Sequence, residues 1–327
     1  MIKAVILFVI GLILLIKGGD WFVDGATGIA ERFHIPEILI GATVVSIGTT
    51  LPEVMVSATS AAKGIGDMAY GNAIGSIICN TALVSAITIA VKPAIVEKKS
   101  LRFPVICFFI AAFFYSAVAY VAQGFSRTTG IILLAMFVAY MVMVVRQAFK
   151  SPATSSEATA TEDEKEDKKE QPLYKEIILL IVGAAAIAVG ADLLVDNGTY
   201  IATALGVPAS VIALTFVALG TSLPELVTAI TSLAKGHGAL SLGNVIGANL
   251  FNLVLVSGIS ITIAPFKIPV EKTIAGMNAS LVMDIPVMLF VMAFMTLPAL
   301  IRGKLSRVQG IVLLLVYFAY VVCQFAL

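Results

Sequence analysis

The chain has 327 residues, of which 59% are hydrophobic and only 13% charged, and its mean hydropathy is +1.03. Soluble domains carry about 25% charged residues, so this composition excludes that class and indicates a protein with many membrane-spanning segments that contacts the lipid bilayer. The net charge of +1 gives no indication of nucleic-acid binding.

Ten apolar runs are long enough to cross a bilayer, because a spanning helix needs about 20 apolar residues. They lie at 3–30, 37–63, 68–91, 103–122, 128–148, 174–204, 209–235, 240–265, 283–301 and 305–326. The sequence therefore predicts an all-α integral membrane protein with ten transmembrane helices. The first run follows Lys3 as in a signal peptide, but it has no A-x-A cleavage site, so we expect a span.

The basic residues are distributed unevenly between the loops. With ten spans and both termini outside, fifteen lysines and arginines fall in cytoplasmic segments, five in external segments and one in the first span, which accounts for all 21. Cytoplasmic loops of membrane proteins carry the excess of Lys and Arg. We therefore expect a multi-pass protein of the plasma membrane, the inner membrane of the cell, with both termini external.

The segment 150–172, between the fifth and sixth runs, is rich in Ser, Thr, Ala, Glu and Lys and has no apolar periodicity. Such a composition is typical of disordered chain. We expect a disordered cytoplasmic linker that joins a first five-helix repeat, 1–149, to a second, 173–327. A solvated tether is the favoured interpretation of its acidic run, and a regulatory role is the alternative.

The two predicted halves share a sequence motif. The run Gly48-Thr49-Thr50-Leu51-Pro52-Glu53 recurs without a gap as Gly220-Thr221-Ser222-Leu223-Pro224-Glu225. The offset in residue number from Gly48 to Gly220, called the motif shift below, also relates many other identical residues. Among them are Asp20 and Asp192, Asp24 and Asp196, Lys63 and Lys235, and Asn80 and Asn252. Toward the ends of the halves the offset is slightly larger and relates Ser126-Arg127 to Ser306-Arg307. This larger offset is called the end shift.

Five spans per half is an odd number, so the second half enters the membrane from the opposite side. The sequence therefore predicts two repeats of inverted topology. Transporters built in this way bind their substrate near the bilayer midplane, where the two repeats meet.

Each motif places a proline and a glutamate within an apolar run. A proline inside a helix has no N–H and clashes with the carbonyl four residues back, here Gly48 for Pro52, so backbone oxygens are released. In lipid such groups are tolerated where they line a cavity or coordinate an ion. Together with two carboxylates and four hydroxyls they predict a site made only of oxygen, which suits hard cations such as Ca²⁺. The alternative is a packing kink with capped carboxylates, but a kink needs no glutamate. The residues of this predicted site are Glu53, Glu225, Thr49, Thr50, Thr221 and Ser222.

A second duplicated element runs from Gly71 to Asn80 and recurs from Gly243 to Asn252. Its glycines, at positions i and i+4, predict close helix packing. Ser76 and Asn80 share one helix face, as do Ala248 and Asn252, and we expect Asn80 and Asn252 to line the cavity with Ser76. For Asn72 and Asn244 we favour interhelical hydrogen bonds.

The remaining polar residues of the runs have structural interpretations. Four aspartates, Asp20, Asp24, Asp192 and Asp196, are expected to lie near span ends and to form caps or ion pairs, for instance Asp20 with Lys17. Asp284, just before Pro286, is expected to begin a helix at the external face.

The histidines and cysteines do not predict a metal centre. His34 and His237 lie at predicted span ends, which makes them poor ligand candidates. The three cysteines, Cys79, Cys107 and Cys323, lie in apolar runs without a C-x-x-C pair, so we expect packing residues rather than a disulfide framework or a zinc site.

The two motif regions resemble the signatures of the sodium/calcium exchanger family, within the cation/calcium antiporter superfamily, which look like G-T-S-L-P-E followed by G-N-x-I-G-S-N-x-x-N/D. The match covers both halves and the ten-span layout. This resemblance implies secondary active antiport of Na⁺ against Ca²⁺ by alternating access. It implies no cofactor and no obligate protein partner.

The resemblance also implies a ligand set. It places Ca²⁺ between Glu53 and Glu225, with backbone oxygens of Thr49 and Thr221. The implied sodium sites use the same glutamates and, in addition, the carbonyls of Ser46 and Ala218, the hydroxyls of Thr50 and Ser222, and Ser76.

Two positions depart from one version of the family pattern. Ala248 stands where a serine is often found, so one sodium site loses a hydroxyl. Asn252 stands where some members have Asp. The potassium-dependent branch resembles the Asp version, so we do not expect this chain to use K⁺.

Three other functions compete with Na⁺/Ca²⁺ antiport. Ca²⁺/H⁺ exchange would use Glu53 and Glu225 as proton carriers. A cation channel with a carboxylate filter is disfavoured by the inverted halves and the apolar midplane. An enzyme is least expected, because the sequence has no visible nucleophile and base set, phosphate loop or soluble domain.

Overall fold

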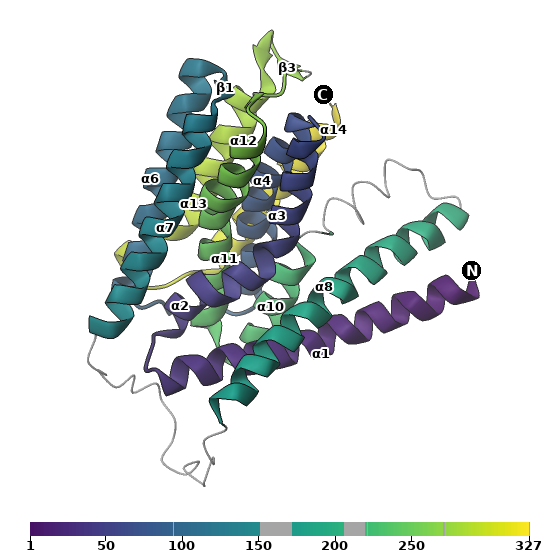
Figure 1. Cartoon of the computed structure of the whole chain (residues 1–327), viewed down its shortest axis with the longest axis vertical. Coiled ribbons are helices and arrows are strands. Elements are labelled where there is room, and N and C mark those ends of the chain that lie inside the picture. The colour runs from purple at the N-terminus through teal and green to yellow at the C-terminus, as the bar shows by residue number, and fades with distance from the viewer. Residues whose placement is uncertain (94, 151–171, 206–219, 221, 271, 327) are drawn as a thin grey trace.

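The computed structural model describes residues 1–93, 95–150, 172–205, 220, 222–270 and 272–326. In these ranges the chain is a bundle of helices with two short antiparallel ribbons at one end (Figure 1). The predicted all-α membrane class is confirmed. Of the predicted linker, only its ends at Lys150 and Pro172 belong to the described residues.

The first half begins with one long helix, α1 (Ile2–Arg32). The next two rods are each interrupted by a π-helical turn, and two uninterrupted helices follow. The first rod is α2 (Glu37–Ile40), η1 (Gly41–Val45) and α3 (Ser46–Ala62), and the second is α4 (Gly66–Cys79), η2 (Asn80–Ser85) and α5 (Ala86–Val91). The last elements are α6 (Lys98–Ala122), β1 (Gly124–Phe125) and α7 (Arg127–Lys150).

The second half begins, like the first, with one long helix. Its first helices are α8 (Leu173–Ala204), α10 (Leu223–Ala234) and the rod of α11 (Gly238–Phe251), η5 (Asn252–Val256) and α12 (Ser257–Ile263). Three strands follow: β2 (Phe266–Lys267), β3 (Thr273–Ile274) and β4 (Met277–Asn278). The chain ends with η6 (Ser280–Asp284), α13 (Ile285–Arg302) and α14 (Arg307–Ala326). Strands β1 and β2 pair across the two halves.

Nine helical rods of the described ranges are long and apolar enough to span a membrane. They correspond to nine of the ten predicted spans. The seventh prediction, 209–235, is described only near its end, where α10 forms, and the rest of it lies outside the described residues.

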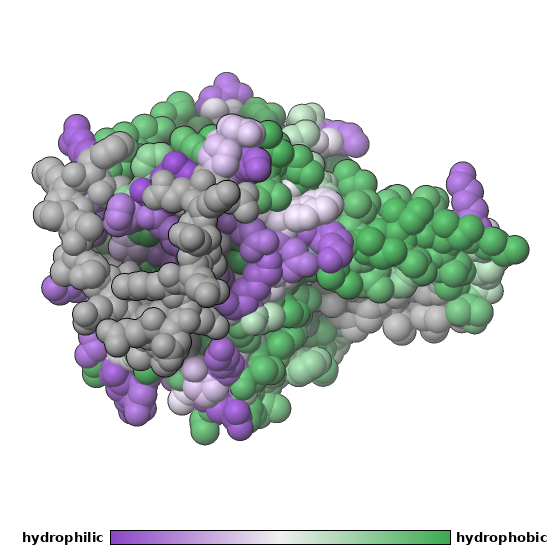
Figure 2. All heavy atoms as spheres, turned by 90° about the horizontal axis from the view of Figure 1, so that it is seen from below, coloured by the Kyte–Doolittle hydropathy of each residue, from purple (hydrophilic) through white to green (hydrophobic). Residues whose placement is uncertain are grey.

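Helices α1 and α8 run side by side and slant away from the other helices (Figure 1). Their backbones touch at Gly11 and Gly190, where a Cβ on either glycine would lie under 3 Å from the carbonyl oxygen of the other. Seen from the perpendicular direction, the pair projects as an arm with an apolar surface (Figure 2). Such a surface is suited to contact with lipid chains, and many of its side chains are exposed, including Ile6, Ile13 and Ile181.

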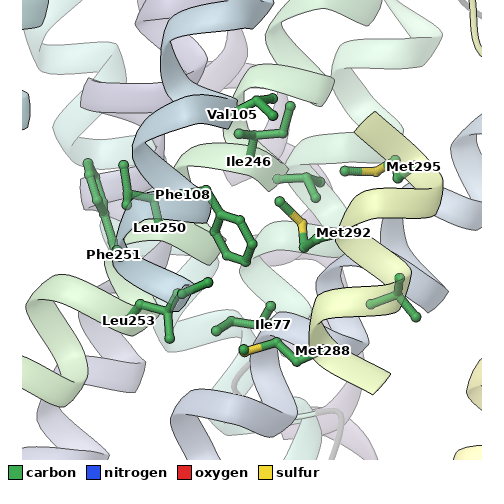
Figure 3. Close-up of a cluster of buried hydrophobic side chains, with 14 of the residues drawn as sticks. Ile77, Val105, Phe108, Ile246, Leu250, Phe251, Leu253, Met288, Met292 and Met295 are labelled. Atoms are coloured by element: carbon green, nitrogen blue, oxygen red, sulfur yellow. The ribbon is translucent and has the colours of Figure 1, made fainter. Parts of the chain in front are cut away.

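The larger apolar core fills the space between the two halves. In Figure 3, Phe108 of α6 lies between Ile246 and Leu250 of α11 and the methionines of α13. Met288 and Met292 are fully buried there. Methionine fills irregular gaps well because its side chain is unbranched and flexible. This core fixes α11, which carries part of the second duplicated element.

The glycines of that element behave differently in the two halves. A Cβ on Gly243 would lie 2.9 Å from the carbonyl carbon of Ile38, and one on Gly247 would lie 2.5 Å from Cα of Ala42, so α11 packs directly on the α2 and η1 backbone. The predicted close packing is confirmed there. It is not seen at Gly71 and Gly75, where an added Cβ would meet no atom of the described residues within 4 Å. The segment equivalent to Ile38 through Ser46 is 210–218, which lies outside the described residues.

Candidate ion-binding site

The two proline motifs lie on α3 and α10. The first motif continues as helix through Pro52, directly after the π-helical turn η1. The second begins its helix at Leu223, with Pro224 in the first turn, where a missing N–H costs nothing. Two predicted site residues, Ala218 and Thr221, lie outside the described residues.

Glu53 and Glu225 are both fully buried, with 0% of each exposed. None of their four carboxylate oxygens has a hydrogen-bond partner among the described residues. The two side chains lie close enough for their charges to repel each other. A buried carboxylate without a partner is costly in free energy, and two that face each other are more so. Such a pair is stabilised when it binds cations or protons.

The two threonines of the first motif lie beside Glu225. The Thr49 hydroxyl donates to Asn244 Oδ1 at 3.1 Å, so this side chain is already engaged. The Thr50 hydroxyl is buried and has no partner among the described residues. Of these two hydroxyls, that of Thr50 is the one free to act as a ligand, and Thr49 is left with its backbone oxygen.

Asn80 and Asn252 occupy equivalent places in the fold, each as the first residue of a π-helical turn. Both are fully buried, and neither the amide oxygen nor the amide nitrogen of either has a partner among the described residues. Single π-helical turns inside α-helices are frequent at functional sites. Ser76, one turn earlier on α4, is also buried, with 5% exposed.

Ser46 and Ser222, two further predicted ligands, are also buried. The single hydrogen of the Ser46 hydroxyl is shared between the Gly41 carbonyl, at 2.7 Å, and the Asn244 carbonyl, at 3.0 Å. The Ser46 carbonyl lies 3.5 Å from the Thr49 hydroxyl. Ser222 is buried beside Cys79. Ala248, on α11, is fully buried and offers no side-chain oxygen.

The predicted interhelical hydrogen bonds of Asn72 and Asn244 are confirmed. Asn72 Nδ2 donates from α4 to Ser57 Oγ at 2.8 Å and to the Glu53 carbonyl at 3.2 Å, both on α3. Asn244 lies on α11, in the other half, and accepts a hydrogen bond from the hydroxyl of Thr49, which is also on α3. Helix α3 is thus held from both halves.

Sequence reasoning missed three polar groups near the motif. Thr228 and Ser232 are fully buried on α10, and their hydroxyls have no partner among the described residues. They follow Glu225 at i+3 and i+7, which puts all three on one helix face, and this spacing was the available signal. The Asn244 amide nitrogen is the third such group.

Two of the aspartates form ion pairs, although they lie well inside α1 rather than at a span end. Asp20 lies 3.8 Å from Lys17, as predicted, and 3.5 Å from Lys235 at the end of α10. Asp24 accepts a shorter contact from Lys235, at 2.7 Å. Their equivalents on α8, Asp192 and Asp196, are exposed and form no ion pair with the described residues.

Asp284 directly precedes α13, as the sequence predicts, but the helical rod does not begin there, because the π-helical turn η6 extends it back to Ser280. The Asp284 carboxylate accepts hydrogen bonds from Gln324 at 2.6 Å and from Tyr320 at 3.1 Å on α14.

His237 lies directly before α11, at the span end where the sequence placed it. His237 Nδ1 lies 2.7 Å from Glu37 Oε1 at the start of α2, and this hydrogen bond raises the pKa of His237. The three cysteines are free thiols. The described residues contain no group of three or more His, Cys, Asp or Glu that is arranged to hold a metal. The candidate site therefore combines two carboxylates with neutral oxygens, a donor set that favours hard cations.

Comparison with known proteins identifies the family. A model of the sodium/calcium exchanger protein family matches residues 3–146 and 175–326. The chain is 34% identical to an uncharacterized membrane protein of Methanocaldococcus jannaschii, over 95% of this chain and 94% of that protein. It is 28% identical to the sodium/calcium exchanger MaX1 of Methanosarcina acetivorans, over 98% of both chains.

A solved structure has the same architecture. The sodium-calcium exchanger NCX_Mj, in crystals soaked with Na⁺ and Sr²⁺, matches with a TM-score of 0.81 and 32% identity over 98% of both chains. The duplicated motifs, the helical membrane fold and these matches lead to one conclusion. The chain belongs to the sodium/calcium exchanger protein family.

Proposed function

We propose that this chain exchanges Na⁺ for Ca²⁺ across the membrane by alternating access, with the ions bound between Glu53 and Glu225. The observation that carries the proposal is the pair of fully buried glutamates whose four oxygens have no partner among the described residues. Two ionised carboxylates carry a charge of −2, which one Ca²⁺ neutralises. Several Na⁺ ions can replace that charge, and this competition is the basis of exchange.

The proposed calcium ligands are Glu53, Glu225 and the backbone oxygens of Thr49 and Thr221. For sodium, the proposal adds Thr50, whose buried hydroxyl has no partner, and the amides of Asn80 and Asn252, which are equally unengaged among the described residues. The remaining proposed sodium ligands are Ser76, Ser222 and the carbonyls of Ser46 and Ala218.

The proposed organisation is two inverted repeats, 1–149 and 173–327, with both termini external and the linker 150–172 cytoplasmic. A duplicated contact between the halves supports it. Arg127 Nε donates to the Thr262 carbonyl at 3.0 Å, and Arg307 Nε donates to the Ala90 carbonyl at 2.9 Å. Arg127 and Arg307 are related by the end shift, and Ala90 and Thr262 by the motif shift. The same contact made twice is what two symmetry-related repeats produce.

Ca²⁺/H⁺ exchange is the second candidate, because two buried carboxylates that face each other can also bind protons. The experiment that separates the two is Ca²⁺ uptake into proteoliposomes loaded with Na⁺, with K⁺ or with a pH gradient. Uptake driven by internal Na⁺ at equal pH supports the proposal. Uptake driven by the pH gradient without Na⁺ favours the second candidate.

The site itself is tested by Glu53→Gln and Glu225→Gln. Each substitution leaves one carboxylate for a divalent ion in a fully buried site, so Ca²⁺ affinity should fall by more than about 100-fold, equivalent to about 3 kcal/mol, and transport should cease. The exposed glutamate Glu31 supplies the control, because Glu31→Gln should transport normally. Normal Ca²⁺ flux in either site variant, with the protein monodisperse, would remove the central claim.

A further inference from the structure

Two loops at one end of the bundle are joined to each other. Ile95, in the loop that follows α5, forms an isolated β-bridge with Lys304, in the loop between α13 and α14. Next to this bridge, the Val96 N–H donates to the Gly303 carbonyl at 2.9 Å. The loops therefore form one continuous surface between the ends of α5, α6, α13 and α14, at the end of the bundle where α7 reaches Lys150.

This surface is strongly basic. Seven exposed basic residues lie within 92–102 and 302–307, and Glu97 is the one acidic residue of these two ranges, so seven positive charges and one negative charge give a formal charge of +6. The Glu97 carboxylate accepts a hydrogen bond from the Ser100 hydroxyl at 2.7 Å. The seven basic residues are called the basic patch below. They are Lys92, Lys98, Lys99, Arg102, Arg302, Lys304 and Arg307.

Most of the basic patch has no hydrogen-bond partner. The Lys98 ammonium donates to the Ile301 carbonyl at 2.6 Å, and Arg307 Nε donates to the Ala90 carbonyl at 2.9 Å. The other five side chains form no hydrogen bond and no ion pair with the described residues. Because these positive charges share one surface, they repel one another, and an anion that binds among them relieves the repulsion.

The basic residues at the ends of α1 and α10 behave differently. Arg32 Nε lies 3.1 Å from Glu176 Oε2, and the Lys235 ammonium lies 2.7 Å from Asp24 Oδ1. Cytoplasmic loops of membrane proteins carry an excess of Lys and Arg, which accounts for basic residues at this end of the bundle. It does not account for seven of them on one surface with so few partners, while those of α1 and α10 are paired with carboxylates.

The opposite end of the bundle provides an internal comparison. There β1 and β2 pair Gly124 with Lys267, and the two shifts convert this pair into Lys304 and Ile95, the bridge of the basic patch. The same junction therefore forms at both ends. The end shift converts three members of the basic patch, Lys99, Arg102 and Arg302, into Ala279, Val282 and Ala122. The junction can thus form without these basic residues, so their presence has another cause.

Exposed apolar side chains lie among the basic ones. Ile95, in the bridge itself, is 92% exposed, and Ile301, directly before Arg302, is 74% exposed. Val91 and Val308, each next to a member of the basic patch, are exposed as well. All four residues lie at or beside the ends of segments that are long and apolar enough to span a membrane. Basic groups beside exposed apolar groups are suited to the boundary between lipid headgroups and acyl chains.

We propose that the basic patch binds the phosphate groups of anionic phospholipids, while the exposed apolar side chains contact the adjoining acyl chains. Guanidinium groups match the oxygens of a phosphate in pairs, and lysines add point charges. The competing anion is the acidic run 162–170 of the linker, which lies outside the described residues. A water-soluble acidic peptide would neutralise the charge but leave Ile95 and Ile301 in water. An anionic lipid satisfies both the basic and the apolar groups.

The probe is phosphatidylglycerol, added to the purified full-length chain in detergent, with bound lipid counted by native mass spectrometry. The patch variant combines Lys99→Gln, Arg302→Gln and Lys304→Gln, and loss of three charges should weaken phosphatidylglycerol binding by about 100-fold. The matched control combines Lys3→Gln, Lys63→Gln and Lys267→Gln, which removes three exposed charges outside the basic patch and should leave binding unchanged. An equal loss in the two variants would overturn the proposal.

Three further measurements identify the occupant, and none involves ion flux, so their outcome is independent of the Glu53→Gln transport test. A charge-conserving variant, Lys99→Arg with Arg302→Lys and Lys304→Arg, should keep most of the binding. Inorganic phosphate should not displace phosphatidylglycerol, because it has no acyl chains, and displacement would make free phosphate the ligand instead of lipid. Replacement of the acidic residues of 162–170 by their amides should leave lipid binding unchanged. Tighter lipid binding in that variant would show that the linker occupies the basic patch, and would overturn the proposal.

Discussion

The contact between Gly243 of α11 and Ile38 of α2 makes a substitution at this glycine informative. In Gly243→Ala the new methyl group would lie 2.9 Å from the Ile38 carbonyl carbon and from its Cα, and closer still to its carbonyl oxygen. These are backbone atoms, which cannot rotate away as a side-chain end can. Helix α11 must therefore move away from the first half.

The size of the effect follows from what this movement disturbs. Forcing an extra methyl group into a well-packed contact costs about 1–3 kcal/mol, and we expect a loss of stability of about 2 kcal/mol, the middle of that range. Asn244 is the next residue, and its hydrogen bonds with Ser46 and Thr49, at 3.0 and 3.1 Å, cannot keep their length if the helices separate. Because Thr49 belongs to the candidate site, the Ca²⁺ affinity should also fall.

The assay is thermal unfolding of the purified protein in detergent, followed by Ca²⁺ binding. A loss of about 2 kcal/mol corresponds to a Tm lower by about 4–8 °C. Gly238→Ala is the matched control in the same helix, because within the part of the chain that the structure describes no atom lies within 4 Å of its added methyl group. It should leave Tm unchanged or raise it slightly, since alanine is the better helix former. Equal Tm values for the two variants would refute the close contact of α11 with α2.

Three further predictions concern single features. Ala248→Ser restores the hydroxyl that Ser76 offers in the other half, which should strengthen Na⁺ binding by about 1 kcal/mol. The Na⁺ concentration that half-inhibits Ca²⁺ binding should therefore fall about fivefold. An unchanged value would place residue 248 outside the sodium path. Modest shortening of 151–170 should leave transport per folded molecule nearly unchanged, because loop length has a weak entropic effect, and a large change in Ca²⁺ dependence would instead reveal a regulatory site. The third prediction concerns the pair of His237 and Glu37. Because the folded chain raises the pKa of His237, the pair contributes its full stabilisation at pH values below the ordinary histidine pKa. This stabilisation is lost as the pH rises through the raised pKa. The Tm difference between wild type and Glu37→Gln should therefore shrink as the pH rises from below the ordinary histidine pKa of about 6.5 to above the raised value, and a constant difference would exclude this linkage.

Much of the architecture is determined by the sequence itself. Apolar runs of about 20 residues must form helices in lipid, because every backbone polar group needs a partner within its own segment. The duplicated motif singled out Glu53 and Glu225, because a carboxylate in an apolar run is too costly to keep without a role. Their complete burial without hydrogen-bond partners in the described residues agrees with that reasoning.

Other features were decided only by the tertiary structure. The sequence did not indicate that Asn244 reaches across to Thr49, because the contact joins residues 195 positions apart. Neither did it indicate that a π-helical turn continues the Asp284 helix toward its N-terminus, since π-helical and α-helical turns have no distinct residue pattern.

The clearest case is the pair of equivalent lysines. Lys63 and Lys235 follow the same motif at the same spacing, yet Lys235 is bound to two aspartates and Lys63 forms no ion pair with the described residues. Two copies of one sequence carry the same preferences, so the sequence alone cannot say which copy forms a given contact. The difference arises because α1 packs against α10 and brings Asp20 and Asp24 to Lys235, whereas Leu51 and Met55 on the equivalent face of α3 are exposed. Packing of the whole chain breaks the symmetry that the duplicated sequence contains.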